Sequence, residues 1–347
     1  MKTNSRLTSG FSVRRRIPAL VAVALITMAG WVAGAPANTV VIRLATVAPD
    51  RSVWVKALRD AAADVAKVTE GRVQLKIYAG GVQGDEQTVL RKMRVGQLQG
   101  AAFMGQGVRL FCADATVLQL PLMFRTEEEF DQTLKDLDAD LRVAARENQA
   151  EILAWTRQGF AYLYSRKEVA DLGGLRQTKP WLVPDDGFSE TLYRVAAVTG
   201  VSIPISDVLT GLQSGLLDTV YAPPLAMIAL QWHSRVSYKL DLGLAYSTGA
   251  VVLTSESWNK ISAADRPKVQ EVFSRRVEEM NALVRKQNEE AETVMAKQVQ
   301  TVKPTDAAVA EFRQVSETLV KQLTGQAFSE AIAKKFEASL ARQREKK

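Results

Sequence analysis

The residues that carry most enzyme chemistry are scarce in this chain of 347 residues. His233 is the single histidine, so any catalytic triad with a histidine base has to include it. It lies in Ala229-Leu-Gln-Trp-His-Ser234, and no G-x-S-x-G sequence supplies a serine nucleophile to pair with it. We therefore predict that His233 is structural or lies at the rim of a cleft, and we expect no catalytic residue.

Metal and cofactor sites are not encoded either. Cys112 is the only cysteine, so zinc sites built from histidine and cysteine lack ligands, and a buried thiol is the preferred interpretation. Gly105-Gln-Gly107 is followed by Val-Arg-Leu, which does not match the dinucleotide fingerprint. Asp185 and Asp186 are candidates for a cation site, but adjacent side chains in extended chain point apart, which favours a solvated turn. We expect no metal and no cofactor.

The N-terminal segment has the three parts of a secretory signal peptide, which we place at residues 1–37. Arg14, Arg15 and Arg16 form a cationic region, residues 18–33 are apolar, and Ala35-Pro-Ala37 supplies small residues for cleavage after Ala37. The apolar run is short for a transmembrane span, so an uncleaved anchor is the weaker alternative. The sequence leaves Sec and twin-arginine export both open, and either route predicts a periplasmic protein.

The net charge of +7 belongs mainly to this segment. Residues 1–37 contain five basic residues and no acid, so the rest of the chain carries +7 − 5 = +2. A net charge this small does not indicate the basic surface that nucleic-acid-binding proteins carry. No nucleic-acid partner is expected.

The remaining chain alternates strand and helix patterns, which predicts an α/β fold with parallel strands. A first set runs through strands at 40–46, 73–77 and 100–104, with helices between them and a further helix at 130–141. Segments 151–155 and 160–164 are predicted to be adjacent strands, the second of which crosses to another lobe. A second set follows, with strands near 181–183, 201–203 and 217–221, and a strand at 249–254 returns to the first lobe.

These patterns predict two lobes. The first comprises residues 38–160 and 246–285, and the second comprises residues 161–245. Residues 262–300 are predicted to form one long helix, with Ser262 and Asp265 as a capping box. At about 1.5 Å per residue such a helix exceeds one small domain, so we expect it to bridge both lobes. A coiled-coil dimer helix is the alternative. Residues 301–347 are predicted to be C-terminal helices that end in a frayed basic tail from Arg342.

Several segments, in this order, resemble the solute-binding proteins of TRAP (tripartite ATP-independent periplasmic) transporters of the DctP type. They span most of the chain after residue 37. The segments are Arg43-Leu-Ala-Thr-Val-Ala-Pro49, Tyr78-Ala-Gly-Gly-Val-Gln-Gly-Asp-Glu86, Arg91-Lys-Met-Arg-Val-Gly-Gln97, Leu120-Pro-Leu-Met-Phe124, Asp171-Leu-Gly-Gly-Leu175 and Thr210-Gly-Leu-Gln-Ser-Gly-Leu-Leu-Asp218. The resemblance implies a type II periplasmic-binding-protein fold with a closing cleft, a bridging helix and a membrane permease as partner.

The chain departs from that family where many relatives bind a substrate carboxylate. Trp181 and Ala161 stand at positions where the resemblance implies arginines, and Ala222 replaces an asparagine. An aromatic cleft without a guanidinium favours apolar or ring-bearing ligands over a small dicarboxylate. The resemblance is greatest to a subgroup associated with a tetratricopeptide-repeat (TPR) partner, which leaves such a partner open. Lys179 or Arg157 as a substitute anion site is the alternative.

Positions at the carboxyl ends of strands and on crossings between lobes are where open α/β sheets hold ligands. They give twelve candidate cleft residues: Trp54, Gln106, Phe124, Gln158, Tyr162, Trp181, Asp185, Phe188, Tyr221, Pro223, Trp232 and Tyr246.

The sequence therefore predicts a non-catalytic receptor that binds a small organic molecule and delivers it to a TRAP permease. A periplasmic enzyme on the same scaffold, using His233 or the Asp185-Asp186 pair, is a weaker alternative. A sensor subunit for another receptor is a third interpretation, and it differs only in its partner.

Overall fold

The computed structural model describes residues 39–345. The predicted signal peptide, with its apolar run, therefore lies outside the described residues. Across residues 39–345, no helix is both long and apolar enough to cross a membrane.

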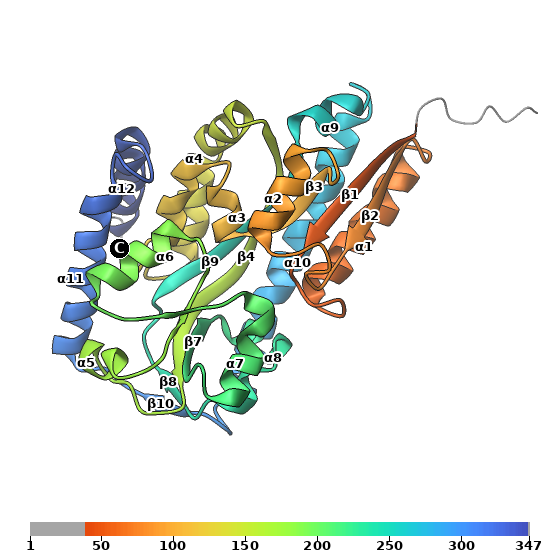
Figure 1. The fold of residues 1–347 in the computed structure, drawn as a ribbon. Helices are drawn as coiled ribbons and strands as arrows, with labels where there is room; N and C mark the ends of the chain where they lie inside the picture. The colour runs from red at the N-terminus through yellow and green to blue at the C-terminus, as the bar shows by residue number, and fades with distance from the viewer. Residues whose placement is uncertain (1–38, 346–347) are drawn as a thin grey trace, which may run out of the picture. The chain divides into compact units, whose positions relative to one another are not determined.

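A five-stranded portion of the main sheet forms the first lobe (Figure 1). The order is β2 (Val73–Tyr78), β1 (Val40–Thr46), β3 (Gly100–Met104), β9 (Ala245–Thr254) and β4 (Ala150–Ser165). The first three strands are parallel, whereas β9 runs antiparallel to both β3 and β4. The sheet is therefore mixed, and its parallel part follows the predicted β-α-β order.

β4 connects the two lobes. The sequence predicted two strands here, but the structure has one strand of 16 residues, which bends at irregularities between Ile152 and Ala154 and between Arg157 and Gly159. Gly159 has a φ of +97°, which a residue without a side chain adopts most readily. These bends let a single strand continue where a break was expected. β4 pairs with β9 as far as Ala161, and after that point it pairs with strands of the second lobe.

The second lobe is built on the far half of β4. There β4 pairs with β7 (Thr219–Ala222) and β8 (Tyr238–Leu240), and β10 (Gln300–Val302) continues the sheet beside β8. A separate two-stranded sheet consists of β5 (Trp181–Leu182) and β6 (Val201–Ser202). The helices of this part are α5 (Leu172–Arg176), α6 (Gly187–Val195), α7 (Val208–Ser214) and α8 (Pro224–Ala229). The two-lobe α/β fold is confirmed, while the predicted domain boundaries stay a prediction.

The helices of the first lobe begin at polar caps. The side chains of Ser52, Asp85 and Thr126 accept backbone N–H groups at the starts of three helices, which satisfies donors that a helix leaves unpaired. The helices are α1 (Val53–Val68), α2 (Glu86–Arg94), α3 (Gly105–Arg109), the short 3₁₀ helix η1 (Ala113–Gln119), α4 (Glu127–Glu147) and α9 (Ser255–Lys260). Neither α3 nor η1 was predicted from the sequence.

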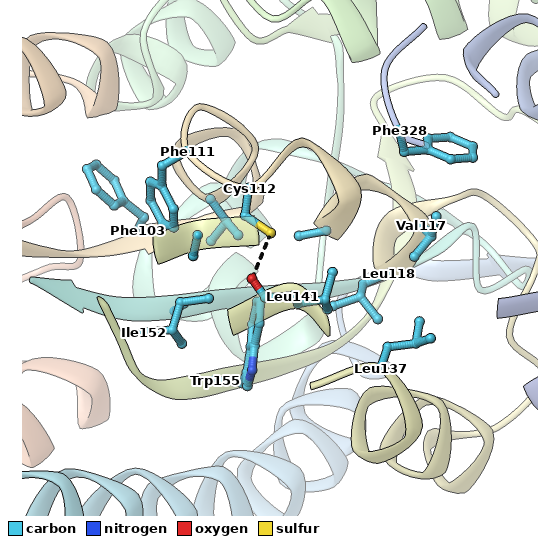
Figure 2. Packing of buried hydrophobic residues seen from close by; sticks show 14 of the residues in the cluster. Phe103, Phe111, Cys112, Val117, Leu118, Leu137, Leu141, Ile152, Trp155 and Phe328 are labelled. Carbon is cyan, nitrogen blue, oxygen red and sulfur yellow. Dashed lines mark hydrogen bonds between the residues drawn. The ribbon is translucent and has the colours of Figure 1, made fainter. Parts of the chain in front are cut away.

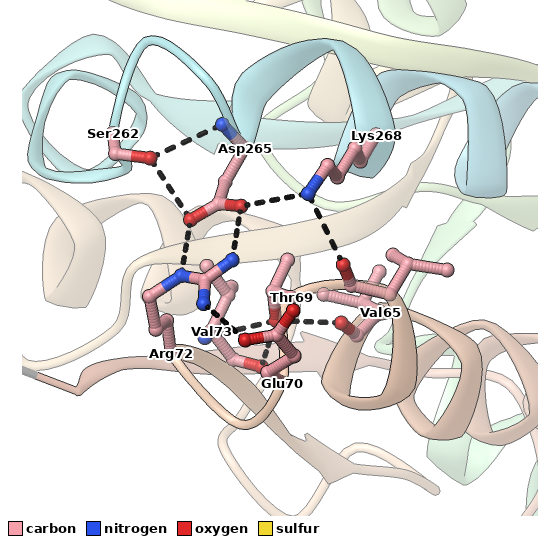
Figure 3. A network of polar contacts seen from close by, with 9 residues as sticks. Val65, Thr69, Glu70, Arg72, Val73, Ser262, Asp265 and Lys268 are labelled. Atoms are coloured by element: carbon pink, nitrogen blue, oxygen red, sulfur yellow. Dashed lines mark hydrogen bonds and ion pairs between the residues drawn. The ribbon is translucent and has the colours of Figure 1, made fainter. Parts of the chain in front are cut away.

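Helix α10 (Arg266–Met295) bridges the lobes, as predicted. Its 30 residues span about 45 Å. Asn281 donates to the Trp155 carbonyl (3.1 Å) on β4, and Asn288 accepts from the backbone N–H of Leu225 (2.9 Å) on α8. Figure 3 shows how the first end of α10 is fixed by Asp265, which pairs with Arg72 from the turn before β2. Polar contacts therefore tie one helix to both lobes.

The C-terminal helices α11 (Asp306–Leu323) and α12 (Glu330–Arg344) lie at the opposite end of Figure 1 from α1 and β2. The prediction of a frayed tail from Arg342 is wrong as far as residue 344. Arg342 pairs with Asp136 (2.8 Å) and Arg344 with Glu129 (3.0 Å), and both acids belong to α4. These basic residues fix α12 to the first lobe, because their ion-pair partners on α4 lie next to the end of α12.

Cys112 lies in the largest apolar cluster. Figure 2 shows its thiol among apolar side chains that include Phe111 and Leu118, with the sulfur directed at the Leu141 carbonyl at 3.4 Å. Burial raises the pKa of the Cys112 thiol to about 12. The thiol therefore stays protonated near neutral pH and fills space in the core, as the sequence predicted.

Candidate ligand cavity

A cavity of about 370 Å³ lies between segments of the two lobes. Its size is within the range of small-molecule sites. The wall comes from the carboxyl ends of β3 and β5, from the β7–α8 junction, and from the crossing strands β4 and β9. Nine of the predicted residues line it: Trp54, Gln106, Gln158, Trp181, Phe188, Tyr221, Pro223, Trp232 and Tyr246. That these residues contact a ligand stays a prediction.

Three predicted residues do not line the cavity. Phe124 packs edge-on against the rings of Phe130 (5.3 Å) and Phe336 (5.6 Å), because α12 covers it. The Tyr162 ring lies under the Lys239 ammonium at 3.7 Å instead. Asp185 has a φ of +51°, and this turn places the neighbouring Asp186 on the wall in its stead.

Stacked rings make the second-lobe side of the wall rigid. Trp181 stacks on Tyr221 with 5.2 Å between ring centroids and meets Trp232 edge-on at 5.4 Å. The Trp181 indole donates to the Ile203 carbonyl (2.9 Å), and the Tyr193 hydroxyl donates to the Trp181 carbonyl (2.5 Å). These bonds satisfy the indole N–H and the carbonyl of Trp181, so its ring presents an apolar face.

Arg109 also lines the cavity, although it was not predicted from the sequence. Its Nη2 donates to both carboxylate oxygens of Asp186 at 2.8 Å, and its Nη1 donates to Gln119 Oε1 at 2.6 Å. The guanidinium carbon lies 4.7 Å from the centre of the Phe188 ring. Arg109 ends the short helix after β3, so the strand-end criterion that selected Gln106 would have found it if extended by three residues.

The close packing of Gln119 against α3 depends on a glycine. A Cβ on Gly105 would lie 1.9 Å from the Gln119 amide nitrogen, so a side chain there would displace Gln119 from Arg109. The Gly105-Gln-Gly107 sequence, which does not fit a nucleotide-binding loop, therefore has a packing role at the cavity.

Glu86 is a buried acid on the same wall. Its two carboxylate oxygens accept the backbone N–H groups of Met104 (2.5 Å) and Gly107 (2.7 Å). Burial raises the pKa of Glu86 to about 7, although these two N–H groups and the nearby Arg109 charge oppose the rise. The cavity wall thus contains a carboxyl group that titrates near neutral pH.

Contacts between the first and second lobes surround this polar region. Gln106 Nε2 donates to the Pro184 carbonyl (2.7 Å), and Gln87 Nε2 donates to the Asp185 carbonyl (3.3 Å). Together with the Arg109–Asp186 pair, they join α2 and α3 to the segment just before α6.

A family comparison identifies the scaffold. Residues 44–326 match the DctP family, described as bacterial extracellular solute-binding protein, family 7. The chain belongs to this family. Members of the DctP family are solute-binding receptors and not enzymes, so this chain is a receptor, as the sequence predicted.

Relatives of this DctP-family protein are distant in sequence and similar in fold. A solute-binding protein of Chromohalobacter salexigens is 23% identical over 233 residues, which are 66% of this chain and 68% of that protein. A TRAP periplasmic solute-binding protein of Xanthobacter autotrophicus, solved with bound β-D-galacturonate, has a TM-score of 0.80 at 17% identity and covers 86% of this chain and 99% of its own. One of Desulfovibrio salexigens, with bound orotic acid, has a TM-score of 0.79 at 14% identity, with coverages of 87% and 99%.

The substitute anion sites predicted for this DctP-family chain are not at the cavity. Arg157 pairs with Asp131 (2.7 Å) and Glu278 (2.6 Å), and Lys179 is directed at the Gly215 carbonyl (3.4 Å). Neither residue lines the wall, because acids and a carbonyl close to them in the fold hold their charged groups. That part of the alternative is wrong.

The structure also places the residues on which the enzyme alternative depends, His233 and the Asp185-Asp186 pair. His233 Nδ1 lies 3.2 Å from the Met227 carbonyl and is not on the wall. Asp186, the one member of the acidic pair that reaches the cavity, is held by Arg109. Within residues 39–345, no group of three or more histidine, cysteine or acidic residues is placed to hold a metal ion.

Proposed function

We propose that this protein binds a small, uncharged organic molecule with a ring or another apolar body. One observation carries this proposal. Within residues 39–345, the charged side chains on the wall are Arg109 and three acids, Asp85, Glu86 and Asp186, and the arginine is already paired. Because Arg109 is paired with Asp186 and Glu86 is only partly ionised near pH 7, an anionic ligand would find no free cation among the described wall residues, which is costly where water is excluded.

The shape and chemistry of the wall support a ring-bearing ligand. Trp181 and Tyr221 offer fixed apolar faces, and Phe188 and Tyr246 lie on the same cavity. The amide groups nearby are only partly committed. Gln106 donates to Pro184, and Gln158 Nε2 donates to Thr156 Oγ1 at 2.8 Å, whereas Gln158 Oε1 and Gln119 Nε2 are buried without a hydrogen-bond partner among the described residues and could each meet one polar group of a neutral ligand. Aromatic side chains contribute most when a ligand brings apolar area to them.

We propose further that the receptor works outside the cytoplasm and passes its ligand to a TRAP membrane permease. The DctP family match and the leader pattern at residues 1–37 support this location. A periplasmic TPR partner remains part of the proposal, supported by the resemblance of the segments around Tyr221 and Trp232 to that subgroup. Delivery to a permease requires binding and release without turnover.

Native mass spectrometry of the purified protein, followed by organic extraction, tests the ligand class. We expect a carried molecule that is neutral at pH 7 and contains a ring or a long apolar segment. Ala226→Phe, which adds bulk to the cavity wall on α8, should remove most of the bound molecule. Ala229→Phe is the matched control, because it adds the same bulk to the same helix away from the wall. Equal occupancy in both variants would contradict the cavity as the site.

A second candidate is an organic acid whose carboxylate takes Arg109 from Asp186. It is favoured by the position of Arg109 on the wall and by the acids bound in the structurally similar proteins. A carboxylic acid recovered from the purified protein would establish this candidate in place of the first.

A further inference from the structure

The Arg109–Asp186 pair has the features of a ligand-recognition contact made within the protein. The side chain of Arg109 is 12% exposed and that of Asp186 is 8% exposed. Arg109 Nη2 donates to both oxygens of the carboxylate, while the guanidinium carbon lies 4.7 Å from the centre of the Phe188 ring. Arginine holds substrate carboxylates by the same combination of donors, charge and flat surface.

Asp186 is held in this position by its own chain. It is the N-cap of α6, where its side chain also accepts the backbone N–H of Ser189 at 3.3 Å. A carboxylate attached to the wall competes with a dissolved one at a very high effective concentration. A ligand that displaced it would leave a buried carboxylate without its cation, which is strongly unfavourable.

The other charges near the pair add to this competition. Asp85 and Glu86 lie on the same wall, so a second negative group there would meet repulsion as well as a paired arginine. The pair also joins α3 to the segment before α6, beside the bonds from Gln106 and Gln87. Displacing Asp186 would weaken a contact between the lobes.

We propose that Asp186 determines ligand specificity by standing in for a ligand carboxylate at Arg109. It neutralises the arginine, and the cavity consequently selects uncharged ligands over anionic ones of the same shape. The inference rests on the proposed function, because it explains how the site rejects acids.

The experiment compares the native protein with Asp186→Asn. Asparagine keeps the hydrogen-bonding cap of α6 and the side-chain volume but removes the charge. Binding is measured by calorimetry for pairs of ring compounds that differ only in charge, with benzoate and benzamide as the first pair and larger ring carboxylates and their amides as the others. We expect Asp186→Asn to raise the affinity of at least one carboxylate by tenfold or more, while its amide changes by less than threefold. The double variant Asp186→Asn with Arg109→Gln should lose the gain.

Each outcome decides the inference separately from the proposed function. If the protein carries a neutral molecule but no carboxylate gains affinity in Asp186→Asn, the inference is overturned and the function stands. If the native protein carries an acid and Asp186→Asn changes its affinity by less than threefold, both are overturned. If it carries an acid that binds tenfold tighter to Asp186→Asn, the specificity role stands and the neutral ligand class is rejected. A gain that persists in the double variant would also overturn the role of Arg109.

Discussion

Two arginine–aspartate pairs in this protein use the same groups in different ways. Arg72 and Asp265 meet through two guanidinium nitrogens, Nε and Nη2, each 2.9 Å from a separate carboxylate oxygen (Figure 3). Arg109 reaches Asp186 through Nη2 alone. Asp265 also accepts from Ser262 (2.9 Å), whereas the partners around Arg109 are a glutamine amide and an aromatic ring.

The difference follows from what surrounds each pair. Arg72 and Asp265 join the turn before β2 to the start of α10, so their interaction holds two elements of the first lobe together. Arg109 and Asp186 lie on a cavity wall and join segments of different lobes. An arginine–aspartate pair is therefore expected to contribute to stability at Arg72–Asp265 and to ligand selectivity at Arg109–Asp186.

The largest expected effect is a difference in pH dependence between the two regions. Because the pKa of Glu86 is raised to about 7 in the folded protein, the folded state favours the neutral acid. Its stabilising contribution is full below its unfolded pKa of about 4.5 and is lost as pH rises through 7. Relative to Glu86→Gln, the native protein should lose about 3 kcal/mol of unfolding free energy across that window. Urea unfolding at several pH values measures it, and parallel profiles for the two proteins would contradict the assignment.

The structural pair should behave oppositely. The hydrogen bonds from Arg72 hold the pKa of Asp265 far below its usual range, so its contribution is present above the unfolded pKa of about 3.8 and lost only in stronger acid. Asp265→Asn should cost about 2 kcal/mol, with a constant difference from the native protein between pH 5 and 8.

An exposed pair supplies the matched control for that variant. Asp60 pairs with Lys56 one helical turn away on the surface of α1 at 2.7 Å, so Asp60→Asn should change the unfolding free energy by less than about 0.5 kcal/mol. The affinity for the carried ligand should be the same in both variants. A loss of affinity in Asp265→Asn would break the distinction between a structural pair and a cavity pair.

Apart from that control, the smallest expected effects concern two phenylalanines. Phe188→Leu removes the ring under Arg109 and should weaken binding of a ring-bearing ligand about fivefold, close to 1 kcal/mol. Phe124→Leu makes the same change in the core, where it should cost about 1 kcal/mol of stability without altering affinity. Calorimetric titration and urea unfolding of both variants separate the two effects. Equal affinities would show that the Phe188 ring does not contact the ligand.

Much of the fold was predictable because hydrophobic periodicity is a local signal. The strand at 40–46 and the long helix carry continuous patterns, and the structure places β1 and α10 there. β4 was missed as a single strand because its bends at Arg157 and Gly159 interrupt the alternation without ending the pairing. The five-residue helix α3 is too short to show a helical period.

The position of the cavity was predictable from the sequence, but the charged pair on its wall was not. The end of β3 located Gln106, because parallel strands deliver their carboxyl ends to one edge of a sheet, whereas Trp181 begins the short strand β5 of a separate sheet. Phe124 was placed wrongly because its covering helix, α12, comes more than 200 residues later in the chain. The Arg109–Asp186 pair joins positions 77 residues apart, and no local pattern in either segment indicates the other.

The continuity of β4 limits how this receptor can open. One strand, β4, belongs to both lobes, and α10 is bonded to both lobes through Asn281 and Asn288. At β4 the two lobes are joined by a continuous strand and not by a flexible linker. We therefore expect any separation of the two lobes to bend β4 and α10, because both elements belong to both lobes.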